Sequence, residues 1–180
     1  MIDAVSVGEV RPGYELWRPN RERADSITTK IVLVFLLLAT AGLAILVAIT
    51  GFSLMSGGTV MAIVSLIYGL LYAFFAFLVA RWNRGILPVA AALSIILAIF
   101  CAVGANSWFA RDKSGFEEGL VPVTLIGLFV VILGLLQIVL MVVALYGFNQ
   151  EWHVEEERLI GSSEDYGAGA SPENGAPAPA

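Results

Sequence analysis

Charged residues are scarce in this sequence of 180 residues. Only 14% of the residues are Asp, Glu, Lys or Arg, whereas 58% are hydrophobic and the mean hydropathy is +0.85. A soluble globular domain carries about 25% charged residues. This deficit, together with apolar runs that extend beyond about 18 residues, excludes an ordinary soluble domain and predicts an integral membrane protein.

Cysteine and histidine occur once each, as Cys101 and His153. A single cysteine forms no intramolecular disulfide and no thiol redox pair, and a single histidine supplies no bis-histidine haem site and no histidine-rich metal site. The sequence also lacks a phosphate-binding glycine loop, a nucleophile elbow and an HExxH motif. We therefore expect a protein that is not an enzyme and that uses no cofactor and no metal. Cys101 is interpreted as a small apolar filler, and His153 as a solvated residue.

Four long apolar runs cover about residues 31–52, 60–80, 85–105 and 121–148. Each is long enough to cross a hydrocarbon core of about 30 Å at about 1.5 Å per residue. Because a chain in lipid must satisfy its own backbone hydrogen bonds, we predict four transmembrane helices, with Asp25 and Ser26 as candidate caps of the first. The expected fold class is all-α, an integral membrane four-helix bundle over residues 30–148.

Ionisable side chains are absent from all four runs. Proton-coupled transporters keep an ionisable group within the bilayer to carry the coupling. The absence argues against a small multidrug-type antiporter, a class that the chain length and the number of spans would otherwise suggest.

Small and weakly polar residues recur at intervals of four or seven in the predicted helices, a pattern typical of helices that pack closely in lipid. Gln137 differs from the others because its amide needs hydrogen-bond partners in lipid, and we expect it to bond to a Tyr or Ser hydroxyl on another helix. We favour a structural role for this amide, in which it holds helices together, over a role in lining a polar path. The predicted helix-packing residues are Thr40, Ala44, Ala48, Gly69, Ala73, Ala90, Ser94, Ala98, Ala102, Gly127, Gly134 and Gln137.

Aromatic and basic residues flank the predicted helices, as they do at membrane interfaces. Two of them fall in a predicted outer loop, 106–119, which we interpret as an interfacial cap rather than a docking site. Eight of the ten basic residues lie on the side of the membrane that holds both termini. The positive-inside rule therefore predicts a multi-pass plasma-membrane protein with both termini in the cytoplasm. The predicted interfacial anchors are Trp82, Arg81, Arg84, Trp108, Phe109 and Trp152.

The two ends of the chain are predicted to lie outside the bilayer. Residues 1–29 form a cytoplasmic segment in which RPGYELWRP (11–19) is extended, either along lipid headgroups or against a partner. Residues 149–160 are predicted to continue the last helix along the membrane surface, and 161–180, rich in Gly, Ala, Pro and Ser, to form a disordered acidic tail. Because 149–180 holds seven acidic residues and one Arg, we expect no nucleic-acid partner.

These features leave two functional hypotheses. The first, which we favour, is a non-enzymatic accessory or structural subunit that packs against other membrane proteins. The expected partners are the lipid bilayer and either another membrane protein or further copies of the chain. The second is an oligomeric transporter or channel for small solutes, with a path between copies lined by Tyr68, Tyr72, Gln137 and Asn106. A water-filled path requires that a cysteine placed at Gln137 react with a water-borne thiol reagent.

Overall fold

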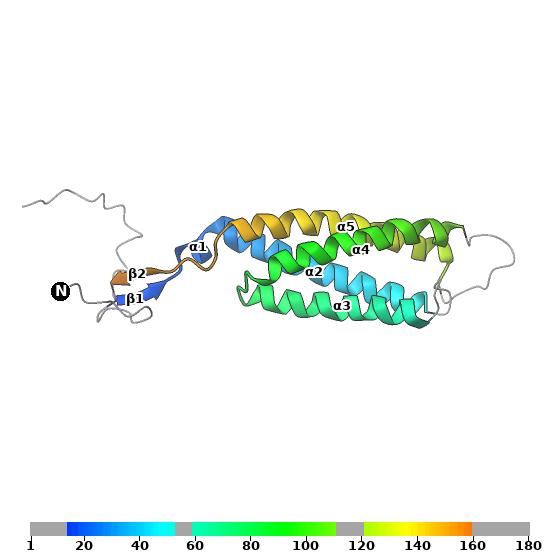
Figure 1. The fold of residues 1–180 in the computed structure, drawn as a ribbon, viewed down its shortest axis with the longest axis horizontal. Coiled ribbons are helices and arrows are strands. Elements are labelled where there is room, and N and C mark those ends of the chain that lie inside the picture. The colour runs from blue at the N-terminus through cyan, green and yellow to red at the C-terminus, as the bar shows by residue number, and fades with distance from the viewer. Residues whose placement is uncertain (1–13, 53–58, 111–120, 160–180) are drawn as a thin grey trace, which may run out of the picture. The chain divides into compact units, whose positions relative to one another are not determined.

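A computed structural model describes residues 14–52, 59–110 and 121–159. Its elements form two compact units: Asn20–His153, which holds the four long helices, and the two end segments, Met1–Pro19 and Val154–Ala180, which hold two short strands (Figure 1). The predicted disordered tail, 161–180, lies outside the described residues. The elements in chain order are β1 (Tyr14–Trp17), α1 (Pro19–Glu22), α2 (Ala24–Thr50), α3 (Thr59–Ala80), α4 (Ile86–Phe109), α5 (Val123–Asn149) and β2 (Glu156–Leu159).

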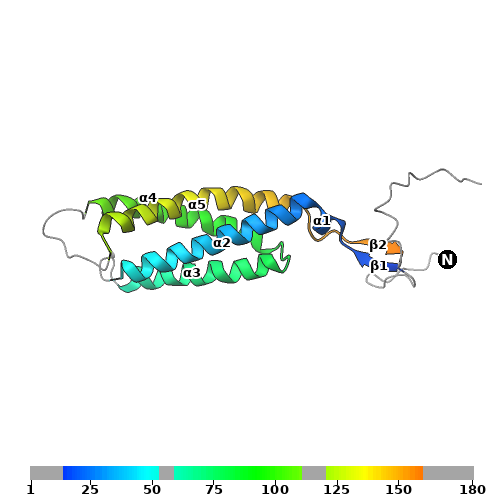
Figure 2. The ribbon, with the colours of Figure 1, turned by 180° about the vertical axis from the view of Figure 1, so that it is seen from behind.

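Helices α2 to α5 confirm the four predicted apolar helices. They contain 27, 22, 24 and 27 residues, and each is long and apolar enough to cross a membrane. Helix α2 packs against α3 and α5, and α4 packs along α5 (Figures 1 and 2). Helices α3 and α4 make few contacts with each other, so the bundle has one loose seam.

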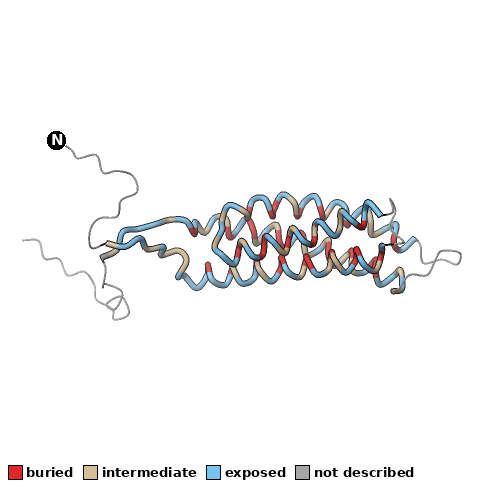
Figure 3. Tube along the Cα trace, turned by 90° about the horizontal axis from the view of Figure 1, so that it is seen from below, coloured by how far each residue is buried: buried red, intermediate tan, exposed pale blue. Residues whose placement is uncertain are grey.

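Apolar side chains cover both the inside and the outside of the bundle. Leu33, Leu37 and Leu140 are fully buried between helices, and buried residues recur along the inward side of each long helix (Figure 3). On the outward sides, Phe35 and Val103 are 68% and 74% exposed. A helix of a soluble protein presents polar residues on its outer face. Four long helices with apolar outer faces instead indicate a multi-pass membrane protein.

Helix α2 begins at Ala24, well before residue 31, where the apolar run starts. The predicted caps Asp25 and Ser26 therefore lie within its first turn, and the N-cap is Arg23, which makes no side-chain capping hydrogen bond. Tertiary packing explains the extension, since Thr29 is buried and Gln150 donates from Nε2 to Thr29 Oγ1 at 2.9 Å. The predicted caps are wrong because contacts with the end of α5, not local sequence, hold this first turn.

Helix α4 continues to Phe109, so residues 106–109 of the predicted outer loop are helical. Packing again accounts for the difference. Trp108 is buried, and a Cβ added at Gly51 or at Gly127 would lie 2.9 Å and 3.2 Å from its side chain. Gly51 leaves room for the indole and Gly127 for the Cβ of Trp108, and this packing extends the helix by a turn. Residues 111–119 of the loop lie outside the described residues.

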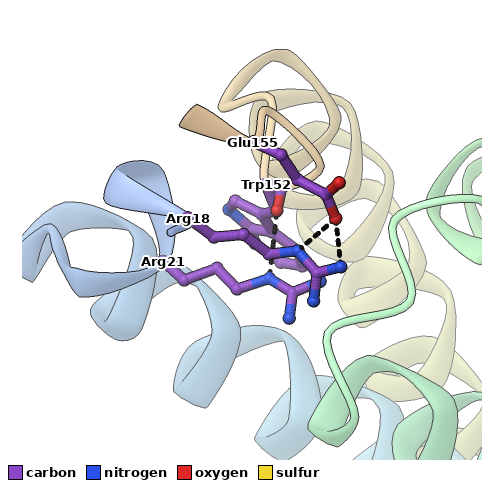
Figure 4. Close-up of polar contacts among 4 residues, drawn as sticks. All are labelled: Arg18, Arg21, Trp152 and Glu155. Atoms are coloured by element: carbon purple, nitrogen blue, oxygen red, sulfur yellow. Dashed lines mark hydrogen bonds and ion pairs between the residues drawn. The ribbon is translucent and has the colours of Figure 1, made fainter. Parts of the chain in front are cut away.

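The predicted helical extension over 149–160 is wrong. Helix α5 ends at Asn149, Glu151 has a left-handed φ of 50°, and β2 pairs antiparallel with β1. Two ion pairs within this unit hold the strands, Arg158 Nη2 to Glu15 Oε1 at 2.7 Å, and Arg18 to Glu155 (Figure 4). The described fold is therefore mostly helical with a two-stranded ribbon, rather than all-α.

Candidate functional site: the central polar network and the aromatic junction

One polar side chain from each long helix meets in the middle of the bundle, in what we call the central polar network. Tyr72 of α3 donates its hydroxyl hydrogen to Gln137 Oε1 of α5 at 3.0 Å. Gln137 Nε2 donates to Thr40 Oγ1 of α2 at 3.2 Å. The Tyr72 hydroxyl also lies 3.4 Å from Ser94 Oγ of α4. The expectation that Gln137 bonds to a hydroxyl on another helix is confirmed.

The direction of each hydrogen bond follows from the groups around Gln137. Its Nε2 lies 3.2 Å from the carbonyl oxygen of Leu133, which only accepts, so the nitrogen and not the oxygen of the amide must face that side. The Oε1 atom then faces Tyr72 and needs its hydrogen. Ser94 gives its own hydrogen to the Ala90 carbonyl at 2.8 Å. Neither the Tyr72 nor the Ser94 hydroxyl has a hydrogen left to donate to the other, so their 3.4 Å approach is a packing contact.

The central polar network is closed to its surroundings. Thr40, Tyr72, Ser94 and Gln137 are each 0% exposed, and every buried side-chain nitrogen and oxygen in the described part of the chain has a partner. A hydrogen bond between membrane helices contributes about 0.6–2 kcal/mol, because the alternative state in the membrane also finds partners. The hydrogen bonds of the network thus link α2, α3 and α5, and Ser94 of α4 packs against Tyr72.

The predicted helix-packing residues divide by burial. Ala102 is exposed because a spacing of four residues advances about 40° around the helix at each step, so the stripe that starts at Ala90 has turned outward by its third step. Gly69 makes the closest approach, since an added Cβ would lie 3.1 Å from the Ala41 carbonyl of α2. Ala73, Ala98 and Gly134 are half-buried, and the buried ones are Thr40, Ala44, Ala48, Gly69, Ala90, Ser94, Gly127 and Gln137.

Two tryptophans meet at the end of the bundle that carries the α3–α4 turn, in what we call the aromatic junction. The rings of Trp82 and Trp152 lie edge to face, with centroids 5.2 Å apart and an interplanar angle of 88°. Lys30 Nζ lies 4.2 Å from the centroid of the Trp82 ring, and Arg21 donates from Nε to the Trp152 carbonyl at 3.0 Å (Figure 4). The junction therefore ties the start of α2 to the segments that follow α3 and α5.

Backbone strain accompanies the aromatic junction. Trp82 has a φ of 63°, and Glu151 precedes Trp152 with a φ of 50°. A left-handed residue other than glycine costs of order 1–3 kcal/mol and persists only where its surroundings over-determine it. The edge-to-face contact and the cations over Trp82 are the interactions that offset this cost.

Arg84 fastens the α3–α4 turn to the end of α5. Its Nε donates to the Phe148 carbonyl at 2.8 Å, and its guanidinium carbon lies 4.2 Å from the centroid of the Phe148 ring. Its Nη1 lies 2.6 Å from His153 Nδ1, which must accept, since a guanidinium has donors only. His153 is thus a partner of Arg84 rather than the merely solvated residue that the sequence suggested.

The predicted interfacial anchors fall into two groups. Arg81 and Phe109 are exposed, and Trp82 and Arg84 are half-buried. Trp108 and Trp152 are buried within the bundle. An indole that anchors a protein among headgroups must expose its ring, so these two fill interior space instead, Trp108 beside Gly51 and Gly127, and Trp152 against Trp82.

Sequence reasoning missed the partners of Trp152. Lys30 and Arg21 lie over the ring of Trp82, which packs against Trp152. Arg21 also donates a hydrogen bond to the Trp152 carbonyl, and Gln150 Oε1 accepts one from Trp152 Nε1 at 3.0 Å. The one local signal was the placement of both tryptophans directly beyond helix ends, which is equally typical of interfacial anchors.

No family model, curated protein sequence or solved structure matches this chain significantly.

Proposed function

We propose that this chain is a non-enzymatic accessory or structural subunit of the plasma membrane that packs laterally against other membrane proteins. Both termini lie in the cytoplasm in this proposal. Support for the orientation comes from five basic residues at the end of the bundle that holds the aromatic junction, Arg21, Arg23, Lys30, Arg81 and Arg84. The positive-inside rule places that end on the cytoplasmic side.

The central polar network carries the proposal. All four of its side chains are 0% exposed and are occupied by one another or by backbone carbonyls. A solute path through a single copy would need polar groups that face water. The surface left for interaction is the apolar outer face of the four helices, where small residues such as Gly42 and Ala102 are exposed. Exposed small residues favour close approach by another helix, because dispersion between close backbones drives association in lipid.

Co-purification at native abundance tests the proposal. A tag is placed after Ala180, the membranes are extracted with a mild detergent, and the recovered proteins are identified and quantified. We expect recovery with another membrane protein in a fixed ratio. Recovery of the chain alone, or only with copies of itself, contradicts the subunit proposal and favours the oligomeric transporter or channel.

A set of outer-face variants shows which helix meets the partner. Phe35→Ala, Phe74→Ala, Ile99→Ala and Leu135→Ala each shorten one exposed side chain, on α2, α3, α4 and α5 in turn. Because none of these residues is buried, each variant keeps the bundle intact. Loss of the partner in one variant, with the other three unchanged, identifies the docking face. Equal recovery in all four, with the yield of the chain unchanged, contradicts docking through any of these faces.

A further inference from the structure

A groove of about 610 Å³ opens along the loose seam between α3 and α4. Val47 of α2 and Val130 and Leu133 of α5 line it together with side chains of α3 and α4, and the lining is predominantly apolar. The groove spans the half of the bundle remote from the aromatic junction, since its α3 residues run from Met61 to Tyr68. Among the described residues, this groove leaves room for another molecule.

Two hydroxyls on one wall of the groove make no hydrogen bond within the described part of the chain. Ser65 and Tyr68 both line it, one turn apart on α3, and neither hydroxyl makes a hydrogen bond to any other described residue. By contrast, the hydroxyl of Tyr72, one turn further along the same helix, is bonded at 3.0 Å. A hydroxyl left unsatisfied in an apolar environment is costly, so a pure hydrocarbon is a poor occupant for this wall.

The size of the groove suits a small molecule. Its volume of about 610 Å³ falls within the range of small-molecule sites, about 300–1,000 Å³.

The depth of the two hydroxyls within the hydrocarbon core limits which lipids reach them. Tyr68 stands nine residues after Thr59, the first residue of α3, which places it about 13 Å along the helix. In a hydrocarbon core about 30 Å thick, this is close to the midplane. The ester groups of a phospholipid lie at the edge of that core, so a phospholipid in its normal position does not bring an oxygen to Tyr68.

We propose that the groove binds a neutral lipid without a charged headgroup, built from a long alkyl or prenyl chain and a carbonyl group. Its carbonyl oxygen accepts hydrogen bonds from Ser65 and Tyr68, and its chain lies along the apolar lining between α3 and α4. The proposal goes beyond a subunit role and does not depend on it, because the site belongs to one copy of the chain.

Photolabelling of the purified full chain in vesicles tests this. The probe is a long-chain alkyl ketone that carries a diazirine, compared with a diazirine alkane of equal length and with a phosphatidylcholine that carries the diazirine on its acyl chain. We expect the ketone to label α3 and α4 peptides several-fold more strongly than the other two probes. Ser65→Ala and Tyr68→Phe each lower this labelling about threefold to tenfold, which is the worth of one hydrogen bond.

Two glycine variants and one tyrosine variant serve as controls. Gly104 lines the groove, and an added Cβ there meets nothing within 4 Å, so Gly104→Leu adds bulk at the groove without a clash at Cβ, and we expect it to abolish labelling. Gly42→Leu, at an equally open position of α2 outside the groove, leaves labelling unchanged. Tyr146→Phe, on an exposed part of α5, also leaves it unchanged.

Four outcomes overturn the proposal. Equal labelling by ketone and alkane means that any hydrocarbon fills the seam, and preferential labelling by the phosphatidylcholine assigns it to an ordinary bilayer lipid. Ketone labelling that survives Gly104→Leu places the site elsewhere. A protein partner that replaces the ketone probe at the same α3 and α4 peptides means that the seam is a protein interface.

Discussion

Removal of the Tyr72 hydroxyl is expected to destabilise the bundle, whereas removal of the Tyr68 hydroxyl is not. The two tyrosines lie one turn apart on α3, and their ring centroids are 6.2 Å apart. Tyr72→Phe deletes the 3.0 Å hydrogen bond to Gln137 and leaves a fully buried Oε1 without its donor. Tyr68→Phe deletes a hydroxyl that bonds to no described residue. The pair therefore compares the same chemical change with and without the loss of a hydrogen bond.

The number of hydrogen bonds lost sets the expected change in the free energy of unfolding. One interhelical hydrogen bond in a membrane bundle is worth about 0.6–2 kcal/mol, so Tyr72→Phe lowers the free energy of unfolding by about 1–2 kcal/mol. Gln137→Leu removes two such bonds, to Tyr72 and to Thr40, and lowers it by about 1–3 kcal/mol. Tyr68→Phe changes it by less than about 0.5 kcal/mol, as expected where no bond is lost.

Reversible unfolding of the purified protein in mixed micelles, by titration with a denaturing detergent, measures these free energies. The double variant Tyr72→Phe with Gln137→Leu completes a mutant cycle, and we expect it to be less destabilised than the sum of the two single variants because they share one bond. Equal effects of the two tyrosine substitutions, or full additivity in the cycle, would refute the central polar network as described.

Three further predictions concern other parts of the chain. Gly69→Ala should destabilise the bundle, because the new methyl group would lie 2.6 Å from an α2 side chain and 3.1 Å from an α2 carbonyl, whereas Gly42→Ala should not; thermal unfolding of both variants measures this. Trp152→Ala should cost about 3–5 kcal/mol in the same assay, because the indole is fully buried. Cysteines at the paired positions Leu16 and Glu157 should form a disulfide on mild oxidation, seen as a mobility shift that reduction reverses, and no shift would contradict the ribbon register.

The helices were predictable from the sequence because their signal is local and strong. Four apolar runs free of ionisable side chains leave no alternative to helices in lipid, and the structure confirms all four. The partner of Gln137 was also predictable in kind, since an amide in an apolar core has to find a hydroxyl or another polar group. That the hydroxyl belongs to Tyr72 follows only from how α3 and α5 are arranged in the bundle.

The ends of the helices and the ribbon were not predictable, because contacts between distant residues decide them. Strand β1 pairs with β2 across more than a hundred residues of chain, and no local pattern in 149–160 encodes that pairing. The burial of Trp108 and Trp152 was not predictable for the same reason. A tryptophan beyond an apolar run is equally consistent with an interfacial anchor and with interior filling, and the space left by Gly51 and Gly127 decides for Trp108.

Access of water to the middle of the bundle shows directly whether the central polar network is sealed or is part of a solute path. Ser94→Cys keeps the bonds between Tyr72, Gln137 and Thr40, and is therefore a gentler reporter than a cysteine at Gln137. The variant is made in a Cys101→Ala background, with Asn149→Cys at the exposed end of α5 as the accessible control. Sealed native membrane vesicles are treated with a water-borne maleimide on each side in turn. If the network is sealed, we expect rapid labelling of the control from one side and none at position 94 from either side until the protein is denatured. Labelling at position 94 in native vesicles, at a rate near that of the control, would contradict it and establish a water-filled path.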